Sequence, residues 1–136
     1  FANSQTKINM KIDTSKKDIF YQFDRFQISQ AFKNVIKNAI EAVNNIPNPS
    51  VAVNLQETNG KIKFSVIDNG VGIDEKKISK LFEPYYTTKE KGTGLGLSIV
   101  KKIIEDHNGI IKIEKNKDMA GTSTHITFEN WWIQKY

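Results

Sequence analysis

Residues 92–102 read GTGLGLSIVKK, and they place three glycines within five positions just before apolar residues at helical spacing. Glycine is a poor helix former, so a glycine cluster at the start of a helix needs a reason. Two readings are open. The cluster is a flexible turn, or it lets the backbone approach a ligand closely while the free N–H groups of the helix start point at that ligand.

A second candidate site ends an apolar segment, in VIDNGVGID at residues 66–74. Val66 and Ile67 predict the end of a strand, and Asp68 follows directly. A carboxylate only accepts hydrogen bonds, so beside glycines that allow close approach it can select an exocyclic amine on a ligand. A plain Asp-Asn-Gly turn is the alternative reading.

A third candidate is a polar stripe on a helix predicted from Arg25 to about Asn45. Asn34 and Asn38 are about one turn apart, so their side chains share a face. An amide oxygen is a hard ligand that suits Mg²⁺, which shares phosphate oxygens and keeps most of its waters. A solvated seam is the alternative. The whole stripe comprises Gln30, Asn34, Lys37, Asn38 and Glu41.

The other positions of this helix are mostly apolar, which predicts a largely buried helix that shows one polar strip to a cavity. Asp24 is suited to cap its start, and the segment IPNP ends it. Asn59-Gly60 predicts a hairpin turn. Ile8, Met10 and Ile12 predict a half-buried strand. Further strands are predicted at residues 18–23, 51–57, 61–68, 110–115 and 122–129, and further helices at residues 74–80 and 95–107.

The composition bounds the function. With 136 residues, 38% hydrophobic and 26% charged, the chain predicts one soluble α/β domain with its helices on one sheet face. The absence of cysteine excludes disulfides and thiolate metal sites. No apolar run approaches the roughly 20 residues that span a bilayer. The net charge is +5, but Lys and Arg are scattered, so we expect no nucleic-acid partner and no direct membrane contact.

Four segments in fixed order resemble the boxes of the ATP-binding catalytic domain of bacterial sensor histidine kinases. They read QISQAFKNVIKNAIEA, VIDNGVGI, KLFEPYYTTKEKG and GTGLGLSIVKKIIEDHNG. This family belongs to the superfamily of DNA gyrase B, Hsp90 and MutL, and the resemblance covers residues 7–128. The last two boxes look most like the nitrogen-regulation branch of sensor kinases.

The resemblance implies a single catalytic domain over residues 1–136 that binds ATP and Mg²⁺. Its expected fold is the Bergerat type: an α/β (α+β) two-layer sandwich with a mixed, mostly antiparallel sheet of about five strands and about three helices on one face.

The resemblance also implies a place for adenine. Asp68 would accept a hydrogen bond from the adenine amino group, and guanine would be disfavoured because it presents a carbonyl there. Gly70 and Gly72 would let the backbone pass close to the base. Thr122 and Thr124 match the strand that closes over the adenine side, with ordinary strand threonines as the alternative.

For the phosphates, the resemblance implies that Asn38 coordinates Mg²⁺ and that Asn34 lies beside the phosphates. The glycine cluster would then pass close to the triphosphate, although its spacing is neither that of a P-loop nor that of a dinucleotide-binding fingerprint. The implied nucleotide-binding residues are Asn34, Asn38, Asp68, Gly70, Gly72, Thr88, Lys89, Gly92, Thr93, Gly94, Leu95, Gly96, Leu97 and Thr122.

The segment that carries Thr87, Thr88 and Lys89 resembles the family's mobile lid. Lys89 or Lys91 is expected to approach the phosphates, with a solvated surface as the alternative for each. Phe82 resembles the residue that docks on the helical partner domain, and core packing is its alternative.

Catalysis is expected to depend on Asn34 and Lys37. The superfamily's ATPases carry a water-activating Glu at the position of Asn34, and an amide cannot replace it as a base. Transfer to a better nucleophile needs mostly positioning and charge neutralisation, so a kinase is favoured over a hydrolase. Many of these kinases carry a Lys where this chain has Glu41, and Lys37 is the candidate for supplying that positive charge.

The phosphoacceptor is expected outside this chain. His107 and His125 are the only histidines, and neither resembles the family's acceptor, which lies on an upstream helical dimerisation domain. The implied partners are that domain and a downstream response regulator. We expect an isolated monomer, a homodimeric parent and a cytoplasmic location, with an inner-membrane anchor of the parent left open. The alternative functions are a protein-serine kinase of anti-sigma-factor type and a silent nucleotide-binding regulatory module.

Overall fold

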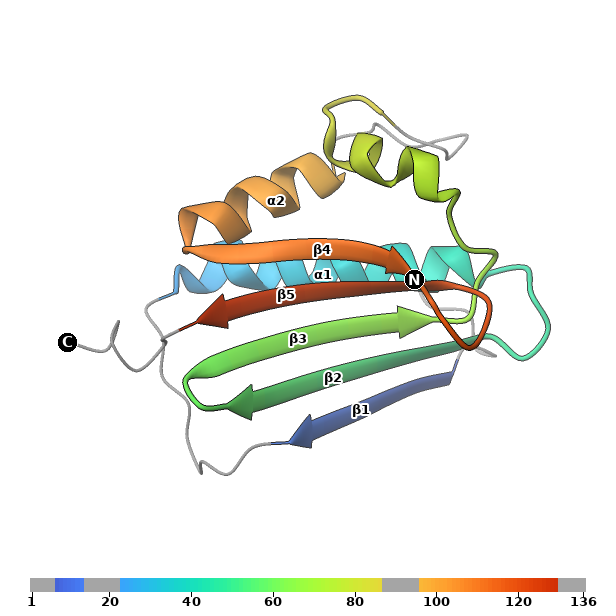
Figure 1. Ribbon diagram of the computed structural model, residues 1–136, viewed down its shortest axis with the longest axis horizontal. Helices are drawn as coiled ribbons and strands as arrows, with labels where there is room; N and C mark the ends of the chain where they lie inside the picture. The colour runs from blue at the N-terminus through green and yellow to red at the C-terminus, as the bar shows by residue number, and fades with distance from the viewer. Residues whose placement is uncertain (1–6, 14–22, 87–95, 130–136) are drawn as a thin grey trace.

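Five strands form one mixed sheet in the computed structural model, which describes residues 7–13, 23–86 and 96–129 (Figure 1). The strands are β1 (Lys7–Asp13), β2 (Ser50–Thr58), β3 (Lys61–Asp68), β4 (Gly109–Lys115) and β5 (Thr122–Glu129). Their spatial order is β1-β2-β3-β5-β4, with β1 parallel to β2 and every other neighbouring pair antiparallel. The predicted mixed, mostly antiparallel sheet is confirmed.

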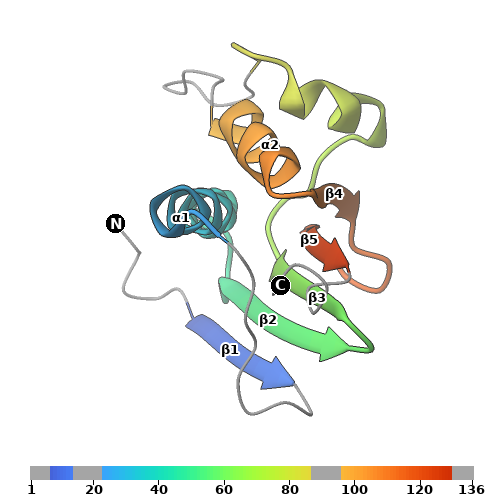
Figure 2. The ribbon, with the colours of Figure 1, turned by 90° about the vertical axis from the view of Figure 1, so that its left-hand side faces the viewer.

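The helices are α1 (Arg25–Ala42), the 3₁₀ helix η1 (Glu75–Phe82) and α2 (Gly96–Asp106). Figure 2 shows α1 and α2 on one face of the sheet. The helix α2 contacts both α1 and β4, while η1 packs against α2 and β4. The two-layer α/β sandwich with about three helices is therefore confirmed.

The predicted local signals are confirmed, with small shifts at the ends of elements. Asp24 caps α1, because its Oδ1 accepts a hydrogen bond from the backbone N–H of Gln27 at 3.0 Å. The helix ends at Ala42, before the predicted end, because the N–H of Val43 bonds three residues back and tightens the last turn. Asn59 and Gly60 form the predicted hairpin turn with φ values of 50° and 80°.

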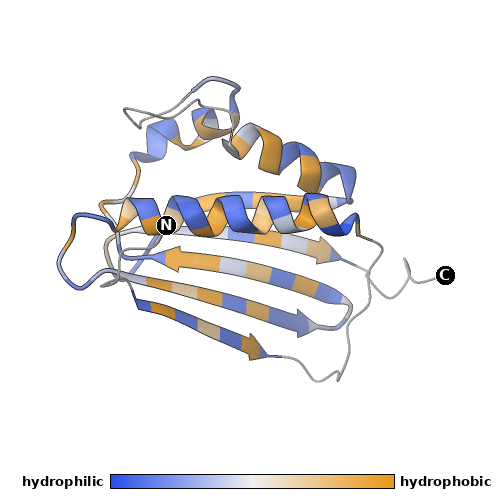
Figure 3. Ribbon diagram, turned by 180° about the vertical axis from the view of Figure 1, so that it is seen from behind, coloured by the Kyte–Doolittle hydropathy of each residue, from blue (hydrophilic) through white to orange (hydrophobic). Residues whose placement is uncertain are grey.

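The burial of α1 is less extensive than predicted. Its buried residues are Ile28, Ala31, Val35, Ala39 and Ile40. Phe26, Ser29 and Lys33 are exposed beside the predicted polar strip, so the solvent face is wide. Figure 3 shows hydrophilic and hydrophobic residues interspersed along α1. The prediction of a largely buried helix is wrong, because these three positions widen the outer face beyond the stripe.

One hydrophobic core between the helices and the sheet holds α1 against the central strands. Phe32 of α1 stacks on Phe64 of β3, with ring centroids 4.0 Å apart and planes 3° apart. Val100 and Ile104 of α2 and Ile126 of β5 are fully buried in the same cluster. This packing fixes the position of α1 relative to the end of β3.

The strand β1 corrects a second expectation. Ile8, Met10 and Ile12 form the predicted strand, but 41%, 74% and 66% of their surfaces are exposed. The prediction of a half-buried strand is wrong, because β1 is an edge strand and α1 packs on β2 and β3. The predicted strand at residues 18–23 lies almost wholly outside the described residues, as do Trp131 and Trp132. Among the helices that are described, none has the length and apolar character needed to cross a membrane.

Candidate functional site

Asp68 is the buried acid at the end of β3. It pairs with Val51, a core residue of β2, so its side chain lies on the helix side of the sheet. Only 5% of its surface is exposed. Its Oδ1 accepts two backbone hydrogen bonds, from Gly70 at 2.9 Å and from Thr122 at 3.2 Å. Burial raises the pKa of the Asp68 carboxyl, and these two hydrogen bonds oppose that rise.

The second carboxylate oxygen of Asp68 differs from the first. No hydrogen bond to Oδ2 comes from the described residues. A buried acceptor without a donor costs free energy, so this oxygen is suited to a donor brought by a ligand. Asp68, the residue predicted to select an exocyclic amine, therefore has Oδ1 bonded within the fold and Oδ2 without a described donor.

Glycine is required at two positions beside Asp68, for two different structural reasons. A Cβ on Gly70 would lie 2.5 Å from the backbone oxygen of Ala42, so glycine is required where the last residue of α1 meets the strand end. Gly72 has a φ of +82°, which side chains rarely adopt. Gly70 is thus required by its contact with α1, and its approach to the adenine base stays a prediction.

The same contact places the two asparagines. The Cβ of Ala42 would be 3.1 Å from a Cβ on Gly70, so this side chain faces the strand end. Asn38 and Asn34 lie one and two turns earlier on nearly the same face of α1. Both are half-buried. The polar strip of α1 therefore leads toward the Asp68 end of β3.

The remaining stripe residues lie further out. Lys37 and Glu41 are exposed, and they are one turn apart on α1. The described residues include no group of three or more His, Cys, Asp or Glu side chains that could hold a metal. A Mg²⁺ ion held by one amide oxygen, phosphate oxygens and water fits this donor set, whereas an all-protein cage does not.

The predicted phosphate side begins at α2. Gly96 starts this helix, and a Cβ placed there would meet no described atom within 4 Å, so the described residues leave room beside it. Leu97 is half-buried beside it. The other candidates of this region lie outside the described residues. They are Thr87, Thr88, Lys89, Lys91, Gly92, Thr93, Gly94 and Leu95.

Two residues that sequence reasoning missed fasten the β4–β5 hairpin to Asp68. Gly121 has a φ of +112°, and a Cβ there would lie 2.0 Å from the backbone oxygen of Asp68. Asn116 donates from Nδ2 to the same oxygen at 2.8 Å. The available signals were a glycine directly before Thr122 and an Asn at the start of a hairpin loop.

Asn69 is a third missed residue. Its Oδ1 accepts from the backbone N–H of Ser50 at 2.8 Å, and its Nδ2 donates to the backbone oxygen of Asn48 at 2.9 Å. These two bonds tie the connection between α1 and β2 to the end of β3. The signal was present in the Asp-Asn-Gly segment, where Asn side chains often bond to nearby backbone.

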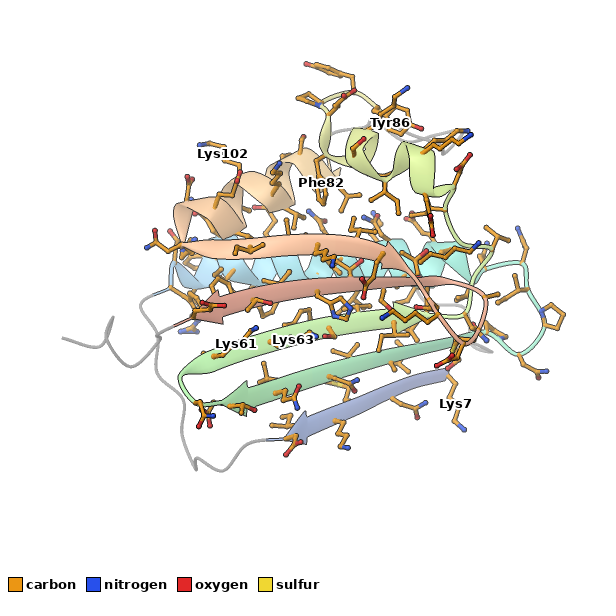
Figure 4. All side chains as sticks on the ribbon, in the orientation of Figure 1. Lys7, Lys61, Lys63, Phe82, Tyr86 and Lys102 are labelled. Carbon is orange, nitrogen blue, oxygen red and sulfur yellow. The ribbon has the colours of Figure 1, made fainter. Side chains whose placement is uncertain are left out.

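Phe82 lies at the end of η1 and is half-buried. The Nζ of Lys101 on α2 is 5.3 Å from its ring centroid, and Figure 4 shows the ring beside α2. Docking on the helical partner domain and core packing both remain open for Phe82, because the ring packs on α2 and is also partly exposed.

The two histidines are bonded within the fold. His125 is hydrogen-bonded from Nδ1 to Ser65 Oγ at 2.7 Å, and its Nε2 lies 3.2 Å from Glu114 Oε1. Burial lowers the pKa of His125, Lys63 lowers it further, and Glu114 opposes the shift.

His107 bonds through Nδ1 to the backbone oxygen of Ile103 at 2.7 Å. Its Nε2 accepts from the backbone N–H of Asp24 at 2.9 Å. The C-terminal end of α2 is thereby joined to the N-cap of α1. Both ring nitrogens of each histidine thus have partners inside the fold.

Comparison with known proteins identifies the type of domain. Residues 23–131 match the family described as histidine kinase-, DNA gyrase B- and HSP90-like ATPase. The nitrogen regulation protein NtrY of Azorhizobium caulinodans is 38% identical over 113 residues, which are 79% of this chain and 15% of NtrY. Sporulation kinase A of Bacillus subtilis is 37% identical over 121 residues, 89% of this chain and 20% of that protein. The chain therefore spans only a small part of these relatives.

Solved structures give the same result. The catalytic domain of histidine kinase ThkA is 35% identical with a TM-score of 0.75, over 90% of this chain and 79% of that one. A second ThkA structure, in complex with the response regulator protein TrrA, is 32% identical with a TM-score of 0.71, over 90% of this chain and 34% of that one. The α/β sandwich described above is the fold that these domains share.

Proposed function

Because this chain belongs to the histidine kinase-, DNA gyrase B- and HSP90-like ATPase family, we propose that it binds ATP with Mg²⁺ and donates the γ-phosphoryl group to a histidine on a separate helical dimerisation domain. The setting is two-component signalling, since the relatives include sensor histidine kinases. The observation that carries the proposal is the Asp68 carboxylate. It is buried at a strand end, its Oδ1 is held by two N–H groups, and its Oδ2 has no described donor.

Adenine recognition follows from that carboxylate. The exocyclic amine of adenine donates to Oδ2 of Asp68, whereas guanine presents a carbonyl oxygen at the same place and two acceptors then face each other. Burial strengthens both the attraction and the repulsion, because water is excluded. Gly72 and Thr122 border the base, and Thr124 continues this side along β5.

The phosphates lie between α1 and the start of α2 in this proposal. Asn38 offers an amide oxygen to Mg²⁺, Asn34 lies beside the phosphates, and the N-terminal end of α2, where the helix dipole is positive, faces them. Bound Mg²⁺ supplies charge neutralisation on the phosphate oxygens. The candidates Thr88, Lys89, Gly92, Thr93, Gly94 and Leu95 complete the binding segment, together with Gly96 and Leu97.

Transfer is favoured over hydrolysis by the same helix. Asn34 stands where the family's ATPases carry a Glu, and its amide cannot remove a proton from water. Lys37 directly precedes Asn38 and lies on the same polar stripe as both asparagines, and we assign to it the charge that Glu41 does not supply. The catalytic pair in this proposal is therefore Asn34 for positioning and Lys37 for charge.

The phosphoacceptor lies on a separate helical domain that docks near Phe82. His107 and His125 are bonded within this fold, which disfavours either as acceptor. A response regulator receives the phosphoryl group afterwards, a proposal supported by the ThkA complex with TrrA. The chain is one cytoplasmic catalytic domain, monomeric alone and part of a homodimeric parent.

The direct test is transfer in trans. The purified chain is incubated with γ-labelled ATP and Mg²⁺, with and without the helical phosphoacceptor domains of NtrY and sporulation kinase A. We expect acid-labile label on an acceptor-domain histidine and none on the chain alone. Acid-stable label on serine would indicate the anti-sigma-factor type of kinase. Bound ATP without transfer to either domain would indicate a silent regulatory module.

A further inference from the structure

Asn116 connects the loop between β4 and β5 to the backbone of Asp68. Its Nδ2 donates to the backbone oxygen of Asp68 at 2.8 Å and to that of Ala120 at 3.1 Å. Its Oδ1 accepts from the hydroxyl of Ser123, and its backbone N–H donates to Gly121 at 3.0 Å. All the hydrogen-bonding groups of this amide side chain are thus engaged in holding the loop.

Asp68 needs this support because the sheet does not provide it on that side. Asp68 pairs with Val51 on β2, but the pairing of β3 with β5 stops one residue earlier, at Ile67 and Ser123. On the β5 side, Asp68 is held by Asn116 at its backbone oxygen and by the N–H of Thr122 at Oδ1.

Close packing makes this arrangement specific. Gly121 approaches the Asp68 oxygen so closely that a Cβ would lie 2.0 Å from it. The amide of Asn116 therefore bonds to an oxygen that the hairpin backbone already surrounds. The hairpin holds the carbonyl and the carboxylate of the same residue at once, and a shift of one moves the other.

We propose that Asn116 is a positioning residue for adenine recognition, which fixes the carbonyl of Asp68 so that Oδ2 meets the exocyclic amine of the base. This inference rests on the proposed function of Asp68. Asn116 need not touch the nucleotide, and it acts through the strand end. Its side chain takes no part in the β3–β5 pairing or in the Thr122 bond, so we expect Asn116→Ala to keep the fold while the carboxylate gains freedom.

The test measures the preference for the amino group rather than affinity alone. Wild type, Asn116→Ala and Asp68→Asn are titrated with ATP and with purine riboside triphosphate, which has the same ring without the amine. We expect Asn116→Ala to weaken ATP binding about tenfold and purine riboside triphosphate binding by less than about twofold. Lys117→Ala, an exposed position in the same loop, is the matched control and should leave both affinities unchanged.

The outcomes separate the two claims. If Asp68→Asn keeps the wild-type preference for ATP, the proposed role of Asp68 is wrong. If Asp68→Asn loses the preference but Asn116→Ala keeps it, or weakens both nucleotides equally, the positioning role is overturned. If Asn116→Ala does not fold, Asn116→Ser, which retains one hydroxyl donor, is titrated instead. We expect it to lose less of the preference for ATP than Asn116→Ala would. Equal weakening of both nucleotides would again overturn the positioning role.

Discussion

The two ends of the proposed nucleotide site are built differently. At the base end, the Asp68 carboxylate is buried and held at 2.9 and 3.2 Å, and α1 and the hairpin approach so closely that Gly70 and Gly121 have no room for a Cβ. At the phosphate end, a Cβ on Gly96 would meet no described atom within 4 Å. The base end is closely packed, whereas no described residue packs against Gly96 at the phosphate end.

The difference follows from what each end must recognise. A flat, neutral base is selected by one acceptor whose position is fixed before binding, because a mobile acceptor can turn away from the wrong base. A triphosphate is charged and hydrated, so helix N–H groups, Mg²⁺ and water can bind it together without one fixed acceptor. Substitutions at the two ends should therefore have different effects on folding and on binding.

Asp68→Asn breaks the base end and has the largest expected effect. The Asn Oδ1 keeps the bonds from Gly70 and Thr122, which places Nδ2 where Oδ2 was. Two donors then face each other at the adenine amine, and we expect ATP affinity to fall about 100-fold or more. Equilibrium dialysis with labelled ATP measures the loss. Removing a buried charge should leave the thermal midpoint unchanged or raised, and wild-type affinity would contradict the assignment.

Gly70→Ala tests whether the base end is closed in the free protein. The new Cβ would lie 2.5 Å from the Ala42 oxygen, so the end of α1 must move. We expect the free energy of unfolding without ligand to fall by about 1–3 kcal/mol. Urea denaturation checks this value. An unchanged midpoint would mean that α1 does not meet the strand end as described.

Gly96→Ala is the matched substitution at the phosphate end. Ala favours a helix over Gly by about 0.5–1 kcal/mol, and the described residues leave room for it. We expect stability to be equal or slightly raised, while ATP affinity falls about tenfold because the methyl group enters the space assigned to phosphate. Loss of stability together with unchanged ATP affinity would remove this glycine from the site.

His125, on the sheet face away from the helices, provides a control outside both ends. Its pKa is lowered in the fold by burial and by Lys63, so the neutral ring is the favoured form. The stability that this ring contributes is complete above its ordinary pKa of 6.5 and is lost as the pH falls through the lowered value. Denaturation at several pH values should show a smaller loss on acidification for His125→Gln than for wild type. Asp68, whose pKa is raised, contributes with the opposite sign in both proteins and cancels in the difference. The difference reports His125 together with Glu114, because His125 helps to lower the Glu114 pKa.

The sequence allowed prediction of the parts whose chemistry is local. Asp68 follows an apolar strand directly, and Asn34 and Asn38 are spaced by a helical turn, so residue type and spacing were enough to single them out. Their order with the glycine segments indicated the fold. Asp24 and the Asn59-Gly60 turn follow from neighbouring residues in the same way.

Other features depend on pairing and layering that no local pattern contains. Asn116 is 48 residues from Asp68, and its role exists only because β3 and β5 are neighbours whose pairing stops at Ile67. Alternation placed Met10 on one side of β1 but could not tell whether a helix covers that side. For α1, apolar positions were visible, but the exposure of Phe26 depends on where the helix meets the sheet.

The most direct test of the central claim is a calorimetric titration of the chain with ATP and with GTP, each with and without Mg²⁺. We expect ATP to bind, more tightly with Mg²⁺, and GTP to bind far more weakly because its carbonyl faces Oδ2 of Asp68. Equal affinities for ATP and GTP, or no binding of ATP in either condition, would contradict an adenine site at the end of β3.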